Sequence, residues 1–562
     1  MGERFTSPPS NNGLSLLSVP AGRLGKQCAI AVLITFAYAV LAGCTRAAPS
    51  SSAEGRHPWT IPHVLRIAEI SEPDNLNPYL SELDVTSDLA FLVYSYLVIT
   101  DNRGRLIGDL ASSVPSLANG GISRDGRTYV YHLRRNIIWQ DGVPFAVRDI
   151  VASWHAVMNP HNNTFDRQGY DRVASIEAAG PRTVVVRLRQ RYPPFVSQFF
   201  AGGAGKPVLP AHIFARSDFN SGELSTHPIG TGPFCFVSWT RGDRFILERF
   251  DRYFKGRPNL SRVEMRFIPD MQTIAVELQE HQVDLIQTAQ ASLIDEYRSI
   301  GGVVIELAPA NRVSSIQINA SKPGLHDVTV RRALAMAVPY QAILHDIEHN
   351  LPSEARNVLP AAAIGYELLP RRTYEPAAAR NLLERAGWRR DADGVRTRNG
   401  VRLAFTLVTV AGNTSGERIG LLLQSSFRTV GVELAMKTYP ARTILTANGP
   451  ILGGSFDLAL YANNLDWDPD LYNLLACDRW YPRGENIDRF CDPRLDALER
   501  AGLQTDDPSR RAAIYRMAGR LIWSEVPYIP LFGGRIIVVR SSDLRNYSVS
   551  PIGWWNAWQW DI

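Results

Sequence analysis

A short apolar run near the start of the chain, from Cys28 to Leu41, limits which residues can belong to the folded body. Arg23 and Lys26 precede the run and give it a positive flank. Because the run is shorter than the ~20 residues that a membrane-spanning helix needs, it is typical of a signal segment that is removed on export. About two dozen residues lie before the run, a leader long enough to leave open whether Met1 is the true start. We therefore expect the folded body within the roughly 520 residues that follow.

The apolar run ends in the tetrapeptide Leu41-Ala42-Gly43-Cys44, and polar and small residues follow at once. The tetrapeptide resembles a lipobox, in which the cysteine is lipidated and becomes the mature N-terminus. It predicts a signal peptide over residues 1–44, a lipid on Cys44, and a flexible Ala/Pro/Ser-rich tether over residues 45–62. The protein would then lie in the periplasm or on the outer face of the cytoplasmic membrane. Ordinary signal cleavage without lipid, close to the same point, is the alternative.

Composition narrows the class of protein. The body is far longer than the ~100 to 200 residues of a single domain, so two or three lobes are expected. It contains no second apolar run of membrane-spanning length, which indicates a globular body tethered by its first residue. The formal net charge of +5 is spread along the chain without a long Lys/Arg block, so a nucleic-acid partner is not expected.

The five cysteines agree with an exported protein. Cys28 leaves with the leader, and Cys44 is the lipidation candidate. Cys477 and Cys491 lie 14 residues apart across a loop rich in Asp, Arg, Gly and Asn, and an oxidising compartment favours a disulfide between them. The loop-entropy model gives such a bond roughly 3 kcal/mol of stabilisation, and two reduced thiols are the alternative. Cys235, between two phenylalanines in a strand-like stretch, is expected to be a buried free thiol.

The spacing of apolar residues predicts an α/β protein. Between residues 63 and 260, turn signals such as Ser123-Arg-Asp-Gly-Arg127 separate short alternating runs, which indicate strands. From about residue 270, apolar residues recur at helical spacing. Strands and helices in this mixed order favour α/β lobes, with the chain passing between lobes more than once. The expected strands are Thr128 to Leu133, Thr183 to Leu188, Arg244 to Phe250, Arg402 to Val410, Phe456 to Tyr461, Tyr528 to Phe532 and Ile536 to Val539, and the expected helices start near Val147 or cover Val330 to Val338, Ala377 to Ala386 and Arg511 to Ser524.

Several strings resemble, in their order and spacing, the extracellular solute-binding proteins of family 5, the periplasmic oligopeptide and dipeptide receptors of ABC importers. The resemblance runs from about residue 65 to the C-terminus, and the collinear set is specific where any single string would be weak. The strings are EPDNLNP (72–78), SRDGRTYVYHLRRNIIWQDGVPFAVRDI (123–150), HPIGTGPF (227–234) with RYF (252–254), DVTVRRALAMAV (327–338), EPAAARNLLERAGW (375–388), WDPD (467–470), NIDRFCDPRLDAL (486–498) and VPYIPLF (526–532).

The resemblance implies a two-lobed periplasmic-binding-protein fold (type II, cluster C-like) with an extra domain that enlarges one lobe. Lobe I would comprise residues 63–97, 226–305 and 526–562, the extra domain residues 98–225, and lobe II residues 306–525. It also implies a monomeric receptor, without cofactor or catalytic activity, that captures a peptide or peptide-like solute and delivers it to an ABC permease in the membrane. Ligand binding would shift an equilibrium between open and closed forms.

In the peptide-binding members, a carboxylate three residues before an acidic-Pro pair binds the amino terminus of the ligand. Counted back from Asp468, that position holds Leu465, and Asp466 is displaced by one. Either a local shift lets Asp466 serve as the anchor, or the ligand has no free α-amine; a solvated loop carboxylate is the third interpretation. The residues assigned to the ligand site are Asp466 as amine anchor, Tyr461, Asn463 and Trp467 as lining of the cleft, and Asn486 nearby.

Other ligands and another role stay open within this fold. The solute could be a nickel chelate, haem, glutathione or a sugar-like molecule, and nickel or haem would favour His, Met or Arg in the cleft. A sensor that reports its ligand to a membrane receptor, without transport, is the alternative from a different functional class.

Two motifs resemble metal sites. The segment from His345 to His349 matches the H-x-x-E-H signature of inverted zinc peptidases, with both histidines expected on one helical face and Glu348 as a base. Alternate aspartates between residues 466 and 470 have the spacing of a calcium loop, but the Gly and Glu that such a loop needs are absent. The zinc peptidase is therefore kept as a remote alternative, and no bound metal is expected.

Overall fold

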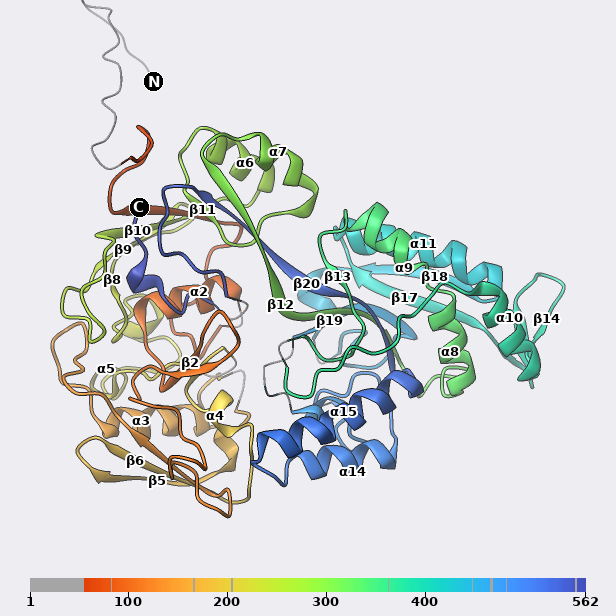
Figure 1. Ribbon diagram of the computed structural model, residues 1–562, viewed down its shortest axis with the longest axis horizontal. Helices are drawn as coiled ribbons and strands as arrows, with labels where there is room; N and C mark the ends of the chain where they lie inside the picture. Colours follow the sequence, from red (N-terminus) through yellow and green to blue (C-terminus); the bar gives the residue numbers. More distant parts are fainter. Residues whose placement is uncertain are drawn as a thin grey trace, which may run out of the picture. The chain divides into compact units, whose positions relative to one another are not determined.

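Figure 1 shows the computed structural model, which describes residues 55–562 except 82, 165–166, 204–205, 362, 447, 465–467, 469, 482 and 551–552. The chain divides into two units, Met1–Pro58 and Trp59–Ile562, and every element below belongs to the second unit. The predicted signal peptide and Cys44 lie outside the described residues. Across the part of the chain that the structure describes, no helix combines the length and apolar character that crossing a membrane requires.

The largest element is a mixed sheet of eleven strands. Its main path runs β18-β17-β19-β12-β20-β11-β1-β10-β9-β8, and β13 pairs with β20 off this path. β1 is parallel to β10 and β11 in one half, and β17 is parallel to β18 and β19 in the other. The bounds are β1 Val64–Glu69, β8 Phe234–Thr240, β9 Arg244–Arg249, β10 Arg262–Phe267, β11 Leu285–Ile286, β12 Val303–Ile318, β13 Ser353–Glu354, β17 Ala404–Val410, β18 Glu433–Tyr439, β19 Leu458–Asn464 and β20 Tyr528–Ser541.

Two long antiparallel strands, β12 and β20, join the halves of this sheet (Figure 1). Residues 303–309 of β12 pair with the end of β20, where β11 also pairs, and residues 313–317 pair with the start of β20. β19 pairs with this second part of β12. The chain thus passes from one half of the sheet to the other through β12 and returns through β20.

The ladder between β12 and β20 is irregular near its middle. The register jumps from the pair Pro309–Arg535 to the pair Val313–Gly533, so three residues of β12 lie opposite Gly534 alone. A Cβ on Gly534 would lie 3.1 Å from two Cβ atoms of this bulged segment, which is tighter than ordinary contact. Since a bulge bends the strand and increases its local twist, this point between the two halves is suited to act as a hinge.

Three short sheets and several helices complete the body. The strands β17–β19 pack with α8, α10 and α11 around one apolar core, and α13, α14 and α15 surround another. The short-sheet strands are β2 Val98–Thr100, β3 Leu106–Gly108, β4 Thr128–His132, β5 Val173–Gly180, β6 Thr183–Leu188, β7 Ala201–Gly202, β14 Arg389–Arg390, β15 Arg396–Arg398 and β16 Val401–Arg402. The α-helices are α2 Asp84–Val93, α3 Val147–Met158, α4 Phe195–Gln198, α5 Ala211–Phe214, α6 Met271–Gln279, α7 Ile294–Ser299, α8 Val328–Met336, α9 Tyr340–Ala342, α10 Pro376–Arg385, α11 Thr414–Val430, α12 Ala441–Ile444, α13 Leu471–Leu475, α14 Pro493–Gly502 and α15 Pro508–Glu525.

Most of the predicted elements are confirmed, with ends shifted by a few residues. Two features were wrong. The runs from Tyr528 and Ile536 are one strand, β20, in which Gly533 and Gly534 interrupt the apolar pattern without ending the ladder. The strand β12 was not recognised at all. Cys235 lies on β8 as a free thiol that is half-buried, and burial raises its pKa to about 11.

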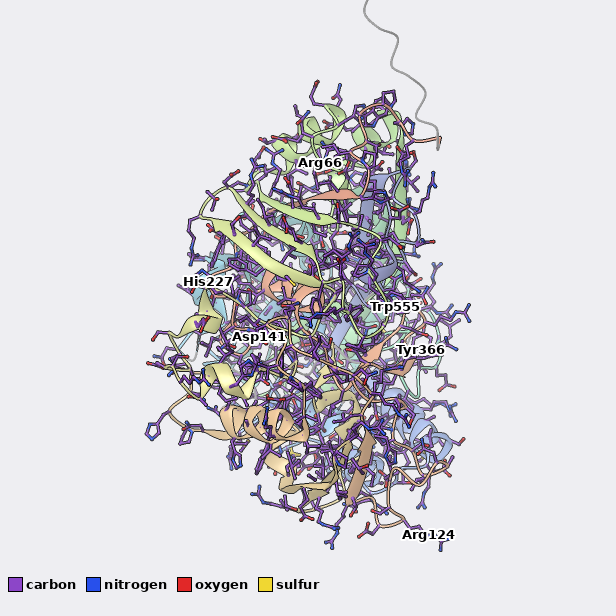
Figure 2. The ribbon with its side chains drawn as sticks, turned by 90° about the vertical axis from the view of Figure 1, so that its left-hand side faces the viewer. Arg66, Arg124, Asp141, His227, Tyr366 and Trp555 are labelled. Carbon is purple, nitrogen blue, oxygen red and sulfur yellow. A yellow bond between two sulfur atoms is a disulfide. The ribbon has the colours of Figure 1, made fainter. Side chains whose placement is uncertain are left out.

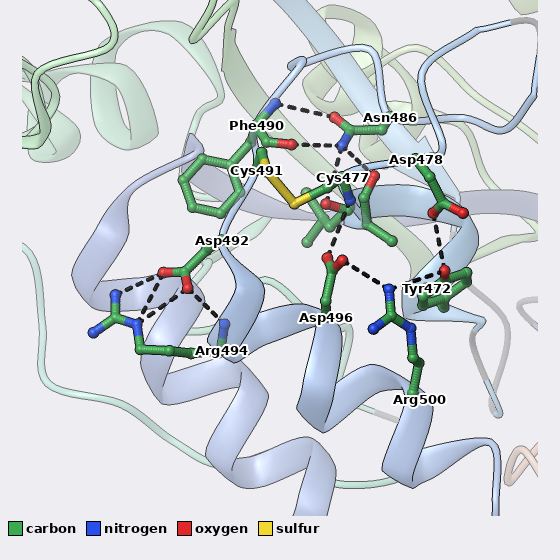
Figure 3. The surroundings of a disulfide bond; sticks show 12 residues. Tyr472, Cys477, Asp478, Asn486, Phe490, Cys491, Asp492, Arg494, Asp496 and Arg500 are labelled. Atoms are coloured by element: carbon green, nitrogen blue, oxygen red, sulfur yellow. Dashed lines mark hydrogen bonds and ion pairs between the residues drawn. A yellow bond between two sulfur atoms is a disulfide. The ribbon is translucent and has the colours of Figure 1, made fainter.

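Cys477 and Cys491 form a disulfide that closes the loop before α14 (Figure 3). Inside this loop, Asn486 is 1% exposed, and its Nδ2 lies 2.8 Å from the carbonyl oxygen of Phe490 and 3.0 Å from two further carbonyl oxygens. The main-chain N–H of Cys477 donates to Asp496 Oδ1 at 3.1 Å, which fixes the loop to α14. The side-chain amide of Asn486 therefore binds main-chain carbonyl oxygens both within its own loop and at the C-terminal end of α13.

We expect the double variant Cys477→Ser/Cys491→Ser to lose about 3 kcal/mol of unfolding free energy, because the unfolded chain is no longer constrained by the 14-residue link. Urea unfolding under non-reducing conditions measures this loss. Cys235→Ser serves as the matched control, since that thiol has no disulfide partner, and its effect should stay below about 1 kcal/mol. A double variant as stable as the unchanged protein would contradict the prediction.

Glu499 on α14 predicts a pH dependence of stability. It is 1% exposed, and no described residue donates a hydrogen bond to its carboxylate. Burial, followed by the charges of Asp496 and Asp470, raises the pKa of Glu499 to about 10. Between about pH 5 and pH 9 the folded protein keeps a proton that the unfolded chain has released, so the free energy of unfolding falls as the pH rises, by up to about 1.4 kcal/mol per pH unit.

Glu499→Gln should remove this dependence, so its stability relative to the unchanged protein should rise between about pH 5.5 and about pH 8.5. Urea unfolding of both proteins at the two pH values is the measurement. Glu433→Gln, at an exposed position on β18, controls for the loss of a carboxylate as such. Parallel pH profiles for the Glu499 variant and the unchanged protein would contradict the assignment.

Candidate functional site

Two residues assigned to the ligand site lie on β19. Tyr461 and Asn463 are two positions apart on this strand, so their side chains point to the same face of the sheet. Tyr461 is half-buried beside an apolar core, and burial raises the pKa of its hydroxyl. Asp466 and Trp467 follow along the chain and lie outside the described residues. Asn486 belongs to the disulfide loop described above.

Asn463 is part of a buried polar cluster with Gln317 of β12 and Asp488 of the disulfide loop. When the Gln317 amide is oriented to satisfy its neighbours, its Oε1 accepts from Asn463 Nδ2 at 3.1 Å, and its Nε2 lies 2.9 and 3.0 Å from the carboxylate oxygens of Asp488. Asp488 Oδ1 also accepts from the main-chain N–H of Ile318 at 3.1 Å. The cluster fixes the end of β19 against β12 and links it to the disulfide loop, and the side-chain amide of Asn463 is held within it.

An ion pair between Asp468 and Arg511 lies just beyond this strand. Their side chains are 7% and 3% exposed, and Arg511 Nη1 donates to Asp468 Oδ2. Arg511 also donates to Tyr515 Oη at 2.8 Å and to the carbonyl oxygen of Gly502 at 3.0 Å. Burial raises the pKa of Asp468 against the opposing effect of Arg511. The sequence marked Asp468 as a motif residue but gave no sign of its partner.

A second group of contacts joins the loop 123–127 to the segment before α15. Arg191 donates to the carbonyl oxygens of Arg124 at 2.8 Å and Asp125 at 3.0 Å, and to that of Gln504 at 2.6 Å. Its Nε also lies 3.1 Å from Asp506 Oδ2. Arg124 is labelled at the lower edge of Figure 2. Arg191 thus holds two segments together that are more than 300 residues apart in sequence.

Two further residues complete these contacts. Gly126 has a φ of +65°, and a Cβ at this position would lie 2.3 Å from Asp506 Oδ2, so the predicted turn needs glycine both for its backbone and for this close approach. The hydroxyl of Tyr192 lies 3.0 Å from Asp470 Oδ2 and 2.9 Å from Gln198 Oε1. We call the contacts of Arg191, Tyr192 and Gly126 with residues 470 and 504–506 the clasp.

The geometry of the H-x-x-E-H segment does not match that of a zinc peptidase. Residues 343–347 form a π-helical turn, and His349 has a positive φ of 52°, so the two histidines do not share a regular helical face. His345 instead contacts Asp346 at 2.6 Å, and Glu348 accepts a hydrogen bond from Ser415. Among the described residues, no group of three His, Cys, Asp or Glu side chains is placed to hold a metal.

Comparison with known proteins identifies the fold and the family. The family model described as "Bacterial extracellular solute-binding proteins, family 5 Middle" matches residues 106–481. Glutathione-binding protein GsiB of Salmonella choleraesuis is 26% identical over 442 residues, 76% of this chain and 82% of that protein. Oligopeptide-binding protein AppA of Bacillus subtilis is 24% identical over 501 residues, 87% of this chain and 89% of that protein.

Solved structures show the same architecture. NikZ from Campylobacter jejuni, in complex with Ni(L-His), has a TM-score of 0.76 at 25% identity and covers 90% of this chain and 100% of its own. AppA from Bacillus subtilis, in complex with a nonapeptide, has a TM-score of 0.74 at 23% identity and covers 88% of this chain and 98% of its own. The fold is therefore the two-lobed α/β fold of these binding proteins, and the chain belongs to family 5 of the bacterial extracellular solute-binding proteins.

Proposed function

We propose that this chain is the substrate-binding lipoprotein of an ABC importer, and that it captures a peptide or peptide-like solute for the membrane permease without catalysing a reaction. Family membership supports the receptor role, and the similarity to AppA supports a peptide as ligand. One structural observation carries the proposal. The large sheet has two halves, and the paired strands β12 and β20 join them.

The bulge in the β12–β20 ladder explains how such a receptor could work. The two halves have separate apolar cores, which resist deformation, so a change of angle would concentrate at the irregular pairing opposite Gly534. A solute that contacts both halves favours the closed form by its extra contacts there. The boundaries between lobes I and II given from the sequence, 305/306 and 525/526, fall within β12 and just before β20.

A metal chelate is the second candidate ligand, because NikZ was solved with Ni(L-His). The described residues include no group of three metal-ligating side chains, so nickel would have to enter with its own ligands. Glutathione, a peptide-like molecule, is compatible with the first proposal, as the similarity to GsiB suggests.

Native mass spectrometry of the mature protein, purified without its lipid from a cell extract, tests the ligand class. We expect a bound mass shift that resolves into a set of short peptides on denaturation, because water-bridged, main-chain recognition tolerates varied side chains. Isothermal titration with the recovered peptides then measures their affinity for the protein. A single non-peptide species or a nickel chelate would contradict the peptide proposal and leave the receptor class in place.

The lipid anchor is tested by Cys44→Ala in cells. We expect the unchanged protein to fractionate with membranes and the variant to lose most of its membrane fraction. Each buried CH₂ of an acyl chain contributes about 0.8 kcal/mol to membrane binding, and the variant has no acyl chain at this position. Cys235→Ser is the matched control and should fractionate as the unchanged protein does. A Cys44 variant that stays in the membrane fraction would overturn the lipoprotein assignment.

A further inference from the structure

A cavity of about 480 Å³ lies at one end of the small sheet of β4, β5 and β6, within the size range of ligand pockets in proteins. Its lining includes residues 132–135, which are the end of β4 and the segment after it, and residues 182–183 at the start of β6. Ser112 and Phe254 complete the lining. Figure 1 shows β5 and β6 at the lower left, away from the long strands β12 and β20.

Positive charge is concentrated in this cavity. Arg134, Arg135 and Arg182 line it together with His132, and the lining contains no aspartate or glutamate. Arg135 and Arg182 are exposed, and among the described residues neither guanidinium group has a hydrogen-bond or ion-pair partner. Because a hollow walled by one sign of charge raises the local concentration of ions of the opposite sign, the cavity favours an anion.

Main-chain contacts fix the segments that carry these arginines. The N–H of Leu133 donates to the carbonyl oxygen of Arg182 at 2.8 Å, which joins the end of β4 to the turn before β6. Arg134 Nε donates to the carbonyl oxygen of Asp109 at 2.7 Å, and its Nη2 donates to that of Gly108 at 3.3 Å. These contacts leave Arg134 Nη1 as a donor for a ligand. The segments are thus positioned before a ligand arrives, which lowers the entropic cost of binding.

The carboxylate of Asp109, close to Arg134 in the fold, is paired with a different cation. Its side chain is 4% exposed and makes an ion pair with Lys255 Nζ. Its Oδ2 also accepts the main-chain N–H of Tyr96 at 2.8 Å. Lys255 directly follows Phe254, and its Nζ lies 5.8 Å from the centroid of that ring. The charges of the three cavity arginines are therefore not compensated by this acid.

We propose that this cavity binds a phosphate group, held by Arg134, Arg135 and Arg182. A phosphate monoester presents three acceptor oxygens and carries close to two negative charges at neutral pH, so it can accept from guanidinium groups on different segments. A carboxylate has one charge and two oxygens in one plane, which suits a single arginine. The phosphate belongs either to a soluble ester or to the headgroup of an anionic phospholipid, since both share this chemistry.

This inference goes beyond the proposed function and does not rest on it. All lining residues lie between positions 112 and 254, so a phosphate bound there contacts no residue of β12 or of the chain that follows it. A ligand without contacts to both halves of the large sheet does not by direct contact favour a closed form. The cavity would instead hold a second ligand, or would orient the anchored body on an anionic membrane surface.

The first test is isothermal titration of the mature protein, purified without its lipid, with glycerol 3-phosphate. The titration uses a phosphate-free buffer near pH 7.5 at low ionic strength, because salt screens exposed charges. Acetate at the same ionic strength is the matched ligand, since it is an anion with a carboxylate in place of the phosphate. We expect acetate to bind at least about tenfold more weakly, a difference of about 1.4 kcal/mol. Measurable binding of both anions with equal affinity would overturn the proposal.

Co-sedimentation with vesicles distinguishes the two sources of the phosphate. Phosphatidylglycerol vesicles present an anionic headgroup, whereas phosphatidylcholine vesicles present the same phosphodiester beside a compensating cation. Binding of glycerol 3-phosphate without vesicle binding supports a soluble ester. Binding to phosphatidylglycerol vesicles at least about tenfold tighter than to phosphatidylcholine vesicles supports a lipid headgroup. Failure of both glycerol 3-phosphate and phosphatidylglycerol to bind would overturn the proposal.

A double variant locates the binding. Arg135→Gln/Arg182→Gln should weaken whichever probe binds by at least about tenfold, because two charged donors are lost. Both side chains are exposed, so the variant should unfold at the same urea concentration as the unchanged protein. Arg148→Gln/Arg216→Gln is the matched control, since it removes two exposed charges from the same part of the chain without changing the lining.

The control decides between a site and general surface charge. An equal loss of binding in the two double variants, or no loss in the cavity variant, would overturn the proposal. Peptides recovered from the unchanged protein should bind the cavity variant with unchanged affinity, because no lining residue lies beyond β12. Failure of the phosphate proposal therefore leaves the proposed function in place, and loss of peptide capture leaves the phosphate result standing.

Discussion

The antiparallel pairing of β12 with β20 is the contact on which the rest of the body depends. Every strand of the first half reaches the second half through this ladder, since β11 adds to β20 and β19 adds to β12. Along the paired residues, the irregular part of the ladder is the stretch from Pro309 to Ser315, where the register shifts twice, and the apolar cores lie to either side. Because packed cores move as rigid units while a bulge tolerates bending, the sheet combines two stiff halves with one compliant place.

The clasp holds a different pair of segments by a different physical means. Arg191 donates to the carbonyl oxygen of Gln504 across the two segments, and the hydroxyl of Tyr192 lies 3.0 Å from Asp470 Oδ2. Water can replace each of these bonds when the segments part, so the net free energy of each is about 1 kcal/mol, far less than that of an apolar core. An interface of this kind can open and close without unfolding either side, provided that Gly126 keeps the loop close enough for contact.

The sequence predicted local structure well where one residue pattern decides it. Helix α8 and strand β6 follow from the spacing of their own apolar residues. The strand β12 was missed because its middle, with Pro309, Ala310, Asn311 and two consecutive serines, lacks the β-branched alternation of a strand. Its partners β19 and β20 supply the ladder. The candidate site was harder still to predict from the sequence. The clasp residues that contact one another are more than 300 positions apart, and no local pattern encodes such a pairing. Local signals marked the turn around Gly126 and the WDPD string that contains Asp470, but not the contact between them and their partners.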